Sequence, residues 1–316
     1  MPEIGYAFSS EEHLPSDMVR HARLAEEAGF SFGLISDHFH PWTDAQGQSP
    51  FVWSVIGAIA EATERLRLGT GVTCPLIRIH PAVVAQATAT CAAMMPGRFF
   101  LGVGTGENLN EHVTGVGWPA PDERVAMLEE ALEAMREHWT GETTTFRGDW
   151  YEIDHARIYT LPDEPIEVYV AATAPLAARL AAEHDGLIST SPDEEVVSEF
   201  DDAGGAGKPK IGMVHGCYGP DYGAALRAAH EIWPNGALKG PLGQDLREPA
   251  DFEAAAQMVR PEDIAASSPV GPDPEPWHEQ IRSFERAGFT HVYLHQIGPD
   301  QAGFIEFAAR ELLPHG

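Results

Sequence analysis

The sequence predicts an α/β protein built as a (β/α)8 barrel, with insertions at the C-terminal face of the strands. Apolar, β-branched stretches alternate with helical stretches along all 316 residues, and the early ones are short and continuously apolar, as buried parallel strands are. An open dinucleotide-binding sheet usually carries GxGxxG after its first strand, whereas this chain has Ser9-Ser10-Glu11-Glu12 there. The alternation therefore favours one barrel domain over residues 1–316.

Eight strands are expected from these apolar stretches. They cover residues 4–8, 33–36, 68–72, 99–103, 167–171, 186–190, 210–215 and 290–295. Helices are expected from a cap at Ser16 to residue 28, from Ser49-Pro50 to about residue 64, from Pro81 to the residue before Pro96, from Asp122 to residue 139, and at residues 175–183, 277–287 and 304–313. Gly29 should close the first of these helices.

Two segments interrupt the alternation. In residues 141–160 a turn sequence, Arg147-Gly148-Asp149, separates two runs rich in β-forming residues. This pattern predicts a hairpin insertion. Residues 218–276 are rich in Gly, Pro and acidic residues and should hold extra helices. Because insertions at the strand ends of a barrel commonly form lids or walls, the second segment is expected to form part of the substrate pocket.

The charge balance is strongly acidic. Twenty basic residues against 48 acidic ones give a formal net charge of −28, and only Lys208, Lys210 and Lys239 are lysines. Such a surface repels phosphate backbones, which excludes nucleic-acid partners. It favours a halophilic protein, whose self-repulsion is screened by concentrated salt, over an ordinary acidic cytosolic protein.

The cysteines and the apolar runs of the sequence indicate where in the cell the protein is expected to be. Cys74, Cys91 and Cys217 are odd in number and widely spaced, so neither a disulfide framework nor a paired metal motif is expected. No apolar run reaches the roughly 20 residues that span a bilayer. The first five residues lack the pattern of a secretory signal. A cytoplasmic protein without membrane contact is the expectation.

In a barrel of this class the active site lies where the strands end. The titratable and small residues at these ends are therefore the candidate site. In strand order they are Glu11; Asp37, His38 and Trp42; Gly71, Val72 and Cys74; Thr105, Gly106, Glu107 and Asn110; Ala172, Thr173 and Ala174; Thr190; His215; and His295.

Each of the more informative residues also has a structural interpretation. His38 can be an ordinary buried histidine, Glu107 a helix cap and Trp42 loop packing. His215 and His295 can point into the pocket or into the barrel, and Cys74 can touch a cofactor or belong to the core. A metal site at the second strand is disfavoured, because no second cluster completes a ligand set.

Three runs of residues carry a family resemblance. They are Ser36-Asp37-His38-Phe39-x-Pro41-Trp42, Leu68-Gly69-Thr70-x-Val72-x-x-Pro75 and Leu101-Gly102-Val103-Gly104-Thr105-Gly106-Glu107-x-Leu109-Asn110-Glu111. In this order and spacing they resemble the luciferase-like oxidoreductases, and they are most similar to the F420-dependent glucose-6-phosphate dehydrogenase group. The likeness covers residues 1–190 and returns at 287–295. It implies a TIM barrel, a homodimer, and coenzyme F420, a deazaflavin that carries a hydride.

The resemblance also implies roles for the candidate residues. His38 would be the base that removes the substrate hydroxyl proton, Glu107 the acid on the cofactor side, and Trp42 a wall of the reacting face. The cofactor would be bound by Asp37, a cis Gly71–Val72 peptide, Cys74, Thr105, Gly106, Asn110, Ala172, Thr173 and Ala174. The substrate would meet Glu11, Thr190, His215 and His295. A histidine suits the task because its pKa lies near the working pH.

One departure from the group concerns the substrate. The glucose-6-phosphate enzymes grip phosphate with two lysines and an arginine, whereas this chain has Ser191-Pro192-Asp193 where one of the lysines should lie. Whether Arg247 or Arg260 replaces the missing cations is left open by the sequence. An acidic rim without these cations disfavours a dianion, so the expected substrate is an uncharged alcohol or sugar rather than glucose 6-phosphate.

Three further functions compete with an F420-dependent dehydrogenase. An FMN-dependent luciferase-like monooxygenase is the first alternative. A non-catalytic flavin-binding relative is disfavoured by the acid–base pair His38 and Glu107, which a binding module does not need. A metal hydrolase would carry several His and Asp ligands at the strand ends. The physiological direction of hydride transfer is not encoded.

Overall fold

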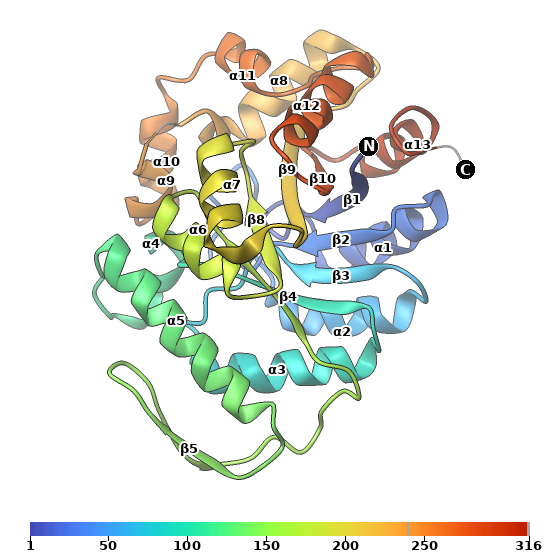
Figure 1. Cartoon of the computed structure of the whole chain (residues 1–316). Helices are drawn as coiled ribbons and strands as arrows, with labels where there is room; N and C mark the ends of the chain where they lie inside the picture. The colour runs from blue at the N-terminus through green and yellow to red at the C-terminus, as the bar shows by residue number, and fades with distance from the viewer. Residues whose placement is uncertain (239, 315–316) are drawn as a thin grey trace.

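The computed structural model describes residues 1–238 and 240–314, and eight parallel strands in this part of the chain close into a barrel (Figure 1). The barrel strands are β1 (Glu3–Phe8), β2 (Phe32–Ile35), β3 (Arg67–Thr70), β4 (Phe99–Val103), β7 (Glu167–Ala171), β8 (Gly186–Ser189), β9 (Lys210–Gly216) and β10 (His291–Gln296). Their order around the barrel is β1-β10-β9-β8-β7-β4-β3-β2, so β1 closes it between β2 and β10. The predicted (β/α)8 fold is confirmed, with every expected strand present.

Helices surround the barrel and lie between consecutive strands (Figure 1). They are α1 (Pro15–Ala28), α2 (Val52–Ala62), α3 (Pro81–Met94), α4 (Asn108–Glu111), α5 (Pro121–His138), α6 (Pro175–Ala182), α7 (Glu194–Phe200), α12 (Glu275–Arg286) and α13 (Gln301–Glu311). Short 3-10 turns cover His112–Thr114 and Pro234–Ala237, and a π-type turn covers Asp201–Gly205. No helix among the described residues is long and apolar enough to cross a membrane.

The start of α2 differs from the expected cap at Ser49-Pro50. The helix begins at Val52, and its N-cap residue is Phe51, which makes no side-chain cap hydrogen bond. The Ser49 hydroxyl donates to the backbone carbonyl of His38, 2.8 Å away. A residue that pattern assigns to a helix cap therefore holds the loop after β2.

The starts of α1 and α5 also differ, since both helices begin at a proline, Pro15 and Pro121, rather than after Ser16 and Asp122. Proline suits a first helical position because its φ is fixed near the helical value and its missing N–H has no partner there. Gly29 closes α1 as expected, with a left-handed φ of 99°.

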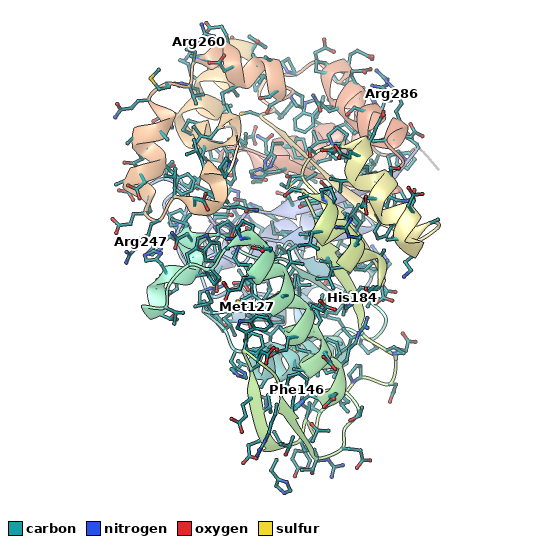
Figure 2. The ribbon with its side chains drawn as sticks, turned by 60° about the vertical axis from the view of Figure 1, so that its left-hand side comes forward. Met127, Phe146, His184, Arg247, Arg260 and Arg286 are labelled. Atoms are coloured by element: carbon teal, nitrogen blue, oxygen red, sulfur yellow. The ribbon has the colours of Figure 1, made fainter. Side chains whose placement is uncertain are left out.

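The two insertions lie at different ends of the molecule (Figure 1). The antiparallel strands β5 (Thr144–Arg147) and β6 (Glu152–Ala156) form the hairpin, whose Phe146 and Ile153 pack on Ala134 of α5 (Figure 2). Between β9 and α12 lie α8 (Tyr222–Ile232), α9 (Leu242–Asp245), α10 (Pro249–Ala256) and α11 (Pro261–Ser267). Trp42, in the loop after β2, packs against the hydrophobic cluster of this helical segment. The helical segment therefore lies against that loop.

Two separate layers of apolar side chains hold the fold together. The larger joins the outer faces of the strands to the helices. The smaller fills the inside of the barrel and contains Phe32, Phe100, Tyr169 and Tyr293. Glycines on neighbouring strands make room for such side chains: a Cβ on Gly69 would lie 2.0 Å from the Phe100 ring. Large and small residues thus interlock across the barrel interior.

Gly102 on β4 tests this close packing. A Cβ there would lie 2.0 Å from the backbone oxygen of Thr70, which cannot move without breaking the sheet. Gly102→Ala should lower the free energy of unfolding by about 3 kcal/mol. Urea denaturation measures this, with Gly117→Ala as the matched control, because nothing lies within 4 Å of a Cβ at Gly117. Equal unfolding midpoints for both variants would contradict the packing argument.

Candidate active site

The buried amide of Asn110 connects the loops after β2 and β4. Its oxygen accepts the backbone N–H groups of Phe39 at 2.9 Å and His40 at 3.3 Å. Its nitrogen lies 3.2 Å from Nδ1 of His38 and 3.2 Å from Oε2 of Glu107. The expected base and acid are therefore brought together through one side chain, which fixes both loops.

His38 lies between the two loops and the end of β1. Its Nε2 is 3.4 Å from Oε1 of Glu11, and its Nδ1 is 3.3 Å from the backbone oxygen of His40. The ring of Trp42 lies 5.0 Å from the imidazole, between centroids. Both ring nitrogens of His38 thus have a polar neighbour, while Trp42 limits access from one side.

Glu11 remains ionised although its carboxylate is buried. Burial alone would raise its pKa, but the neighbouring His38 and a hydrogen bond from Ser36 outweigh burial and hold the pKa of Glu11 below its ordinary value. The Ser36 and Ser9 hydroxyls donate to Oε2 at 2.6 and 3.0 Å. Oε1 is left facing Nε2 of His38.

A buried cluster of charged side chains stabilises the loop after β2, which carries Asp37 and His38. Arg78 donates to Oδ1 of Asp37 at 2.8 Å, and its Nε lies 3.6 Å from Oε1 of Glu111. The Thr73 hydroxyl donates to Oδ2 of Asp37 at 2.7 Å. Burial raises the pKa of Glu111 despite these partners. Both carboxylate oxygens of Asp37 are engaged inside the protein, so contact between its side chain and a cofactor stays a prediction.

The loop after β4 offers backbone donors to a flat ligand. Within the described residues, the backbone N–H groups of Thr105, Gly106 and Glu107 donate to no protein acceptor. Gly106 has a φ of +73°, and a Cβ there would lie 2.6 Å from Sγ of Cys74, which is buried. Glycine is required here because only it combines this backbone with so close a neighbour.

The ends of β3 and β7, the third and fifth barrel strands along the chain, carry the other small residues expected at the cofactor. The peptide bond between Gly71 and Val72 is cis, as the resemblance implies, and both residues are half-buried. Ala172 is buried at the end of β7, whereas Thr173 and Ala174 are exposed at the start of α6. Small side chains and open backbone here fit a flat ring system, and the loop after β4 supplies its donors.

The histidines of β9 and β10 contact each other rather than His38. Nδ1 of His215 lies 2.7 Å from Nδ1 of His295, whose Nε2 lies 2.9 Å from Oε1 of Glu12. Burial, followed by the charge of His295, lowers the pKa of His215 to about 3. The ring of Trp233 lies 4.6 Å from that of His295. Thr190 is exposed just beyond β8, apart from this group.

Sequence patterns missed several residues of the site. Glu12 adjoins an expected residue, yet nothing in the pattern separates its role from that of Glu11. Arg78 lies in a run without any motif signal. Trp233 and Phe252 come from the helical insertion, and the Phe252 ring lies 5.1 Å from that of Trp42. Contacts of this kind depend on loop placement, which local patterns do not encode.

Arg247 and Arg260, which the sequence left open as replacements for the phosphate-binding cations, are exposed on the outer surface of the insertion (Figure 2). The Arg260 guanidinium donates to Asp263 of α11 at 2.9 Å. The segment of Arg247 lies next to the loop after β4, because the Asn108 side chain donates to the Asp245 carbonyl at 3.0 Å. Among the described residues, no group of three His, Cys, Asp or Glu is placed to hold a metal ion.

Comparison with known proteins identifies the family. Residues 4–291 match the luciferase-like monooxygenase family. The chain is 38% identical over 330 residues to the F420-dependent glucose-6-phosphate dehydrogenase of Intrasporangium calvum, covering 99% of this chain and 98% of the relative. It is 38% identical over 327 residues to the enzyme of that name from Nocardia farcinica, covering 99% and 97%. The chain belongs to the luciferase-like monooxygenase family, and the resemblance seen in its motifs is confirmed.

Solved structures point in the same direction. An F420-dependent secondary alcohol dehydrogenase, in complex with an F420–acetone adduct, superposes with a TM-score of 0.90 at 30% identity, covering 98% of each chain. The coenzyme F420-dependent tetrahydromethanopterin reductase of Methanopyrus kandleri gives a TM-score of 0.80 at 21% identity, with 98% coverage of each chain. The second likeness shows the fold alone.

Arg78 offers a test of the cluster beneath the site. Arg78→Met would leave the buried carboxylates of Asp37 and Glu111 without their cation, so the free energy of unfolding should fall by about 3–5 kcal/mol. Urea denaturation measures the loss. Arg147→Met on the exposed hairpin, which removes an arginine paired with Glu152, should leave stability nearly unchanged. Similar midpoints for the two variants would show that the cluster does not hold the loop.

Proposed function

We propose that this protein is an F420-dependent oxidoreductase that transfers a hydride between coenzyme F420 and the CH–OH group of an uncharged alcohol or sugar. The observation that carries the proposal is the linkage of His38 to Glu107 through Asn110, with Glu11 beside His38. A base and an acid held on opposite loops suit a reaction that moves one proton on the substrate side and one on the cofactor side. The names of the relatives support the same cofactor and reaction class.

The loop after β4 and the cis peptide after β3 are the proposed cofactor-binding elements. The backbone N–H groups of Thr105 and Gly106 would donate to the polar edge of the ring, and Val72 would support its face. Ala172, Thr173 and Ala174 would line the path of the tail. When bound, F420 supplies a ring carbon that accepts or returns the hydride.

His38 is proposed to remove the hydroxyl proton of the alcohol. Because the Glu11 carboxylate only accepts, Nε2 would carry a proton on the Glu11 side, and Nδ1, which lies beside the Asn110 amide, would keep the lone pair that takes up the substrate proton. The imidazolium formed by proton uptake then faces an ionised carboxylate 3.4 Å away, which stabilises it. Glu107 would hold the proton needed on the cofactor side, within reach of the Asn110 amide.

The substrate proposal concerns charge. The walls we assign to the pocket are Trp42, Trp233 and the neutral His215, together with ionised Glu11. Such walls suit a neutral molecule and repel a dianion. The helical insertion, residues 218–276, is proposed to form the outer wall, since Phe252 meets Trp42 and the Gln46 amide donates to the Ile232 carbonyl.

Fluorescence titration with oxidised F420, with FMN as the parallel control, tests the proposal. It is run in dilute and in concentrated potassium chloride, because the halophilic character also stays a prediction. We expect F420 to bind and neutral secondary alcohols to bleach its absorbance band. His38→Asn should lower kcat/KM by about 10²–10⁴-fold with little change in F420 affinity. His155→Asn, on the exposed hairpin, should behave as wild type.

Two outcomes would overturn this function. Binding of FMN alone, with oxygen consumption, would assign the chain to the monooxygenase side of the family. Faster oxidation of glucose 6-phosphate than of glucose would overturn the uncharged substrate. The buried thiols of Cys74, Cys91 and Cys217, none of them in a disulfide, agree with the cytoplasmic location that we propose.

A homodimer is also proposed, formed through the groove between α2 and α3. This groove is lined mostly by apolar residues, and Phe51, Val83 and Met94 on its edges are 56%, 53% and 40% exposed. Contiguous exposed apolar surface of this kind marks interfaces, and a symmetric pair would cover it on both copies.

Light scattering after gel filtration tests the homodimer. Val83→Glu should convert the dimer to a monomer, because it places a buried charge in the interface and adds to the negative surface. The matched control is Val116→Glu, in the loop before α5, where Val116 is 56% exposed. This variant should leave the dimer intact. A wild-type monomer in concentrated salt, or a dimeric Val83→Glu variant, would refute the interface.

A further inference from the structure

The carboxylates of Glu11 and Glu12, consecutive residues after β1, serve two different imidazole groups. Glu11 lies against His38 on the β2 side, and Glu12 lies against His295 on the β10 side. Glu12 is fixed in this position, because its Oε2 also accepts the backbone N–H of Gly298 at 2.8 Å. The first pair belongs to the proposed chemistry, whereas the second has no role in it.

The second pair extends to the inner wall of the barrel mouth. His295 and His215 are direct partners in the parallel register of β10 and β9. Two residues earlier, Tyr293 and Met213 pack with the cluster inside the barrel. Since alternate residues of a strand share one face, both histidines point inward, one layer closer to the mouth. The hydrogen-bonded series Glu12–His295–His215 therefore ends on the inner side of the barrel mouth.

The order of donors along this chain follows from the carboxylate. The Glu12 carboxylate only accepts, so Nε2 of His295 carries a proton and donates it. Where the His295 ring is neutral, its Nδ1 keeps a lone pair, and Nδ1 of His215 is then the donor of their 2.7 Å bond. The remaining nitrogen of His215, Nε2, carries a lone pair in that arrangement.

The free end of this chain faces accessible space. His215 is half-buried, and its Nε2 forms no hydrogen bond within the part of the chain that the structure describes. That nitrogen is also absent from the fully enclosed polar atoms that lack a partner, so part of its surface stays accessible. Trp233 packs against the ring at 5.9 Å between centroids and holds its orientation.

We propose that Nε2 of His215 is a fixed hydrogen-bond acceptor for a second hydroxyl of the substrate, so that the preferred substrates are diols, polyols or sugars rather than simple secondary alcohols. The inference rests on the proposed function, because His38 takes the proton of the reacting hydroxyl and His215 binds another. The low pKa of His215 agrees with an acceptor that stays neutral and does not act as a base. Glu12 and His295 act as positioning residues that set its tautomer.

Two alcohols with one carbon skeleton test the specificity. The ratio of kcat/KM for 2,3-butanediol to that for 2-butanol is measured by bleaching of F420. In wild type the diol should be favoured, and His215→Phe, which keeps a flat ring but no nitrogen, should lower the ratio about tenfold. His215→Asn, which retains an acceptor oxygen, should keep part of the preference. His155→Asn is the control and should not change the ratio.

Nitrogen-15 spectra of the histidine rings give a measurement that needs no turnover. His215, assigned by its loss in His215→Phe, should show the tautomer protonated at Nδ1, and its Nε2 signal should shift with 2,3-butanediol but not with 2-butanol. A proton on Nε2, or an unchanged kinetic ratio in His215→Phe, would overturn the inference. If wild type oxidises neither alcohol, the proposed function fails, and the spectra still decide the role of His215.

Discussion

Closure of the barrel by β1 is the constraint on which the rest of the site depends. β1 forms hydrogen-bonded ladders with both β2 and β10, so the first strand joins elements from opposite ends of the chain. Glu11 and Glu12, a few residues beyond the end of β1 at Phe8, can therefore reach both neighbours. Glu11 meets His38 beyond β2, and Glu12 meets His295 on β10, a separation of 283 positions in the sequence.

Buried charge is handled differently in the three parts of the site. The Asp37–Arg78–Glu111 cluster balances carboxylates against a guanidinium and stabilises a loop. The Glu11 carboxylate accepts the hydroxyls of Ser9 and Ser36 and faces His38, so in the proposed function its charge is available to an imidazolium that forms during the reaction. Glu12 instead contacts the imidazole of His295 and orients it. The same residue type thus serves structure and, in the proposed function, also proton transfer and positioning, according to what surrounds it.

The wall opposite the proposed cofactor is assembled from segments with no local relation. Trp42 comes from the loop after β2, and Trp233 and Phe252 come from the helical insertion. The Trp42 ring lies 5.0 Å from the His38 ring, between centroids, and the Phe252 ring packs against Trp42. Variation in such an insertion can change the substrate without disturbing the strand ends that carry the acid and base.

The sequence by itself determined the barrel, its eight strands and the family. Period-2 and apolar patterns are local, and the motif runs around His38 and Glu107 keep their spacing in any structure of this class. It also indicated the cis Gly71–Val72 peptide through the resemblance. Helix starts were less well predicted: Ser49 has the chemistry of a cap, yet its hydroxyl binds the His38 carbonyl because that acceptor is close only in the folded chain.

Only the tertiary structure decided how the candidate residues divide their work. Asn110 was expected at the cofactor, but its amide connects the base loop to the acid loop. The sequence left the direction of His215 and His295 open, and the register of β9 with β10 sets them side by side. Arg247 and Arg260, plausible substitutes by position, are exposed, and Arg260 is paired with Asp263. Pattern fixes which residues a strand end carries, whereas side-chain partners depend on distances between segments remote in the chain.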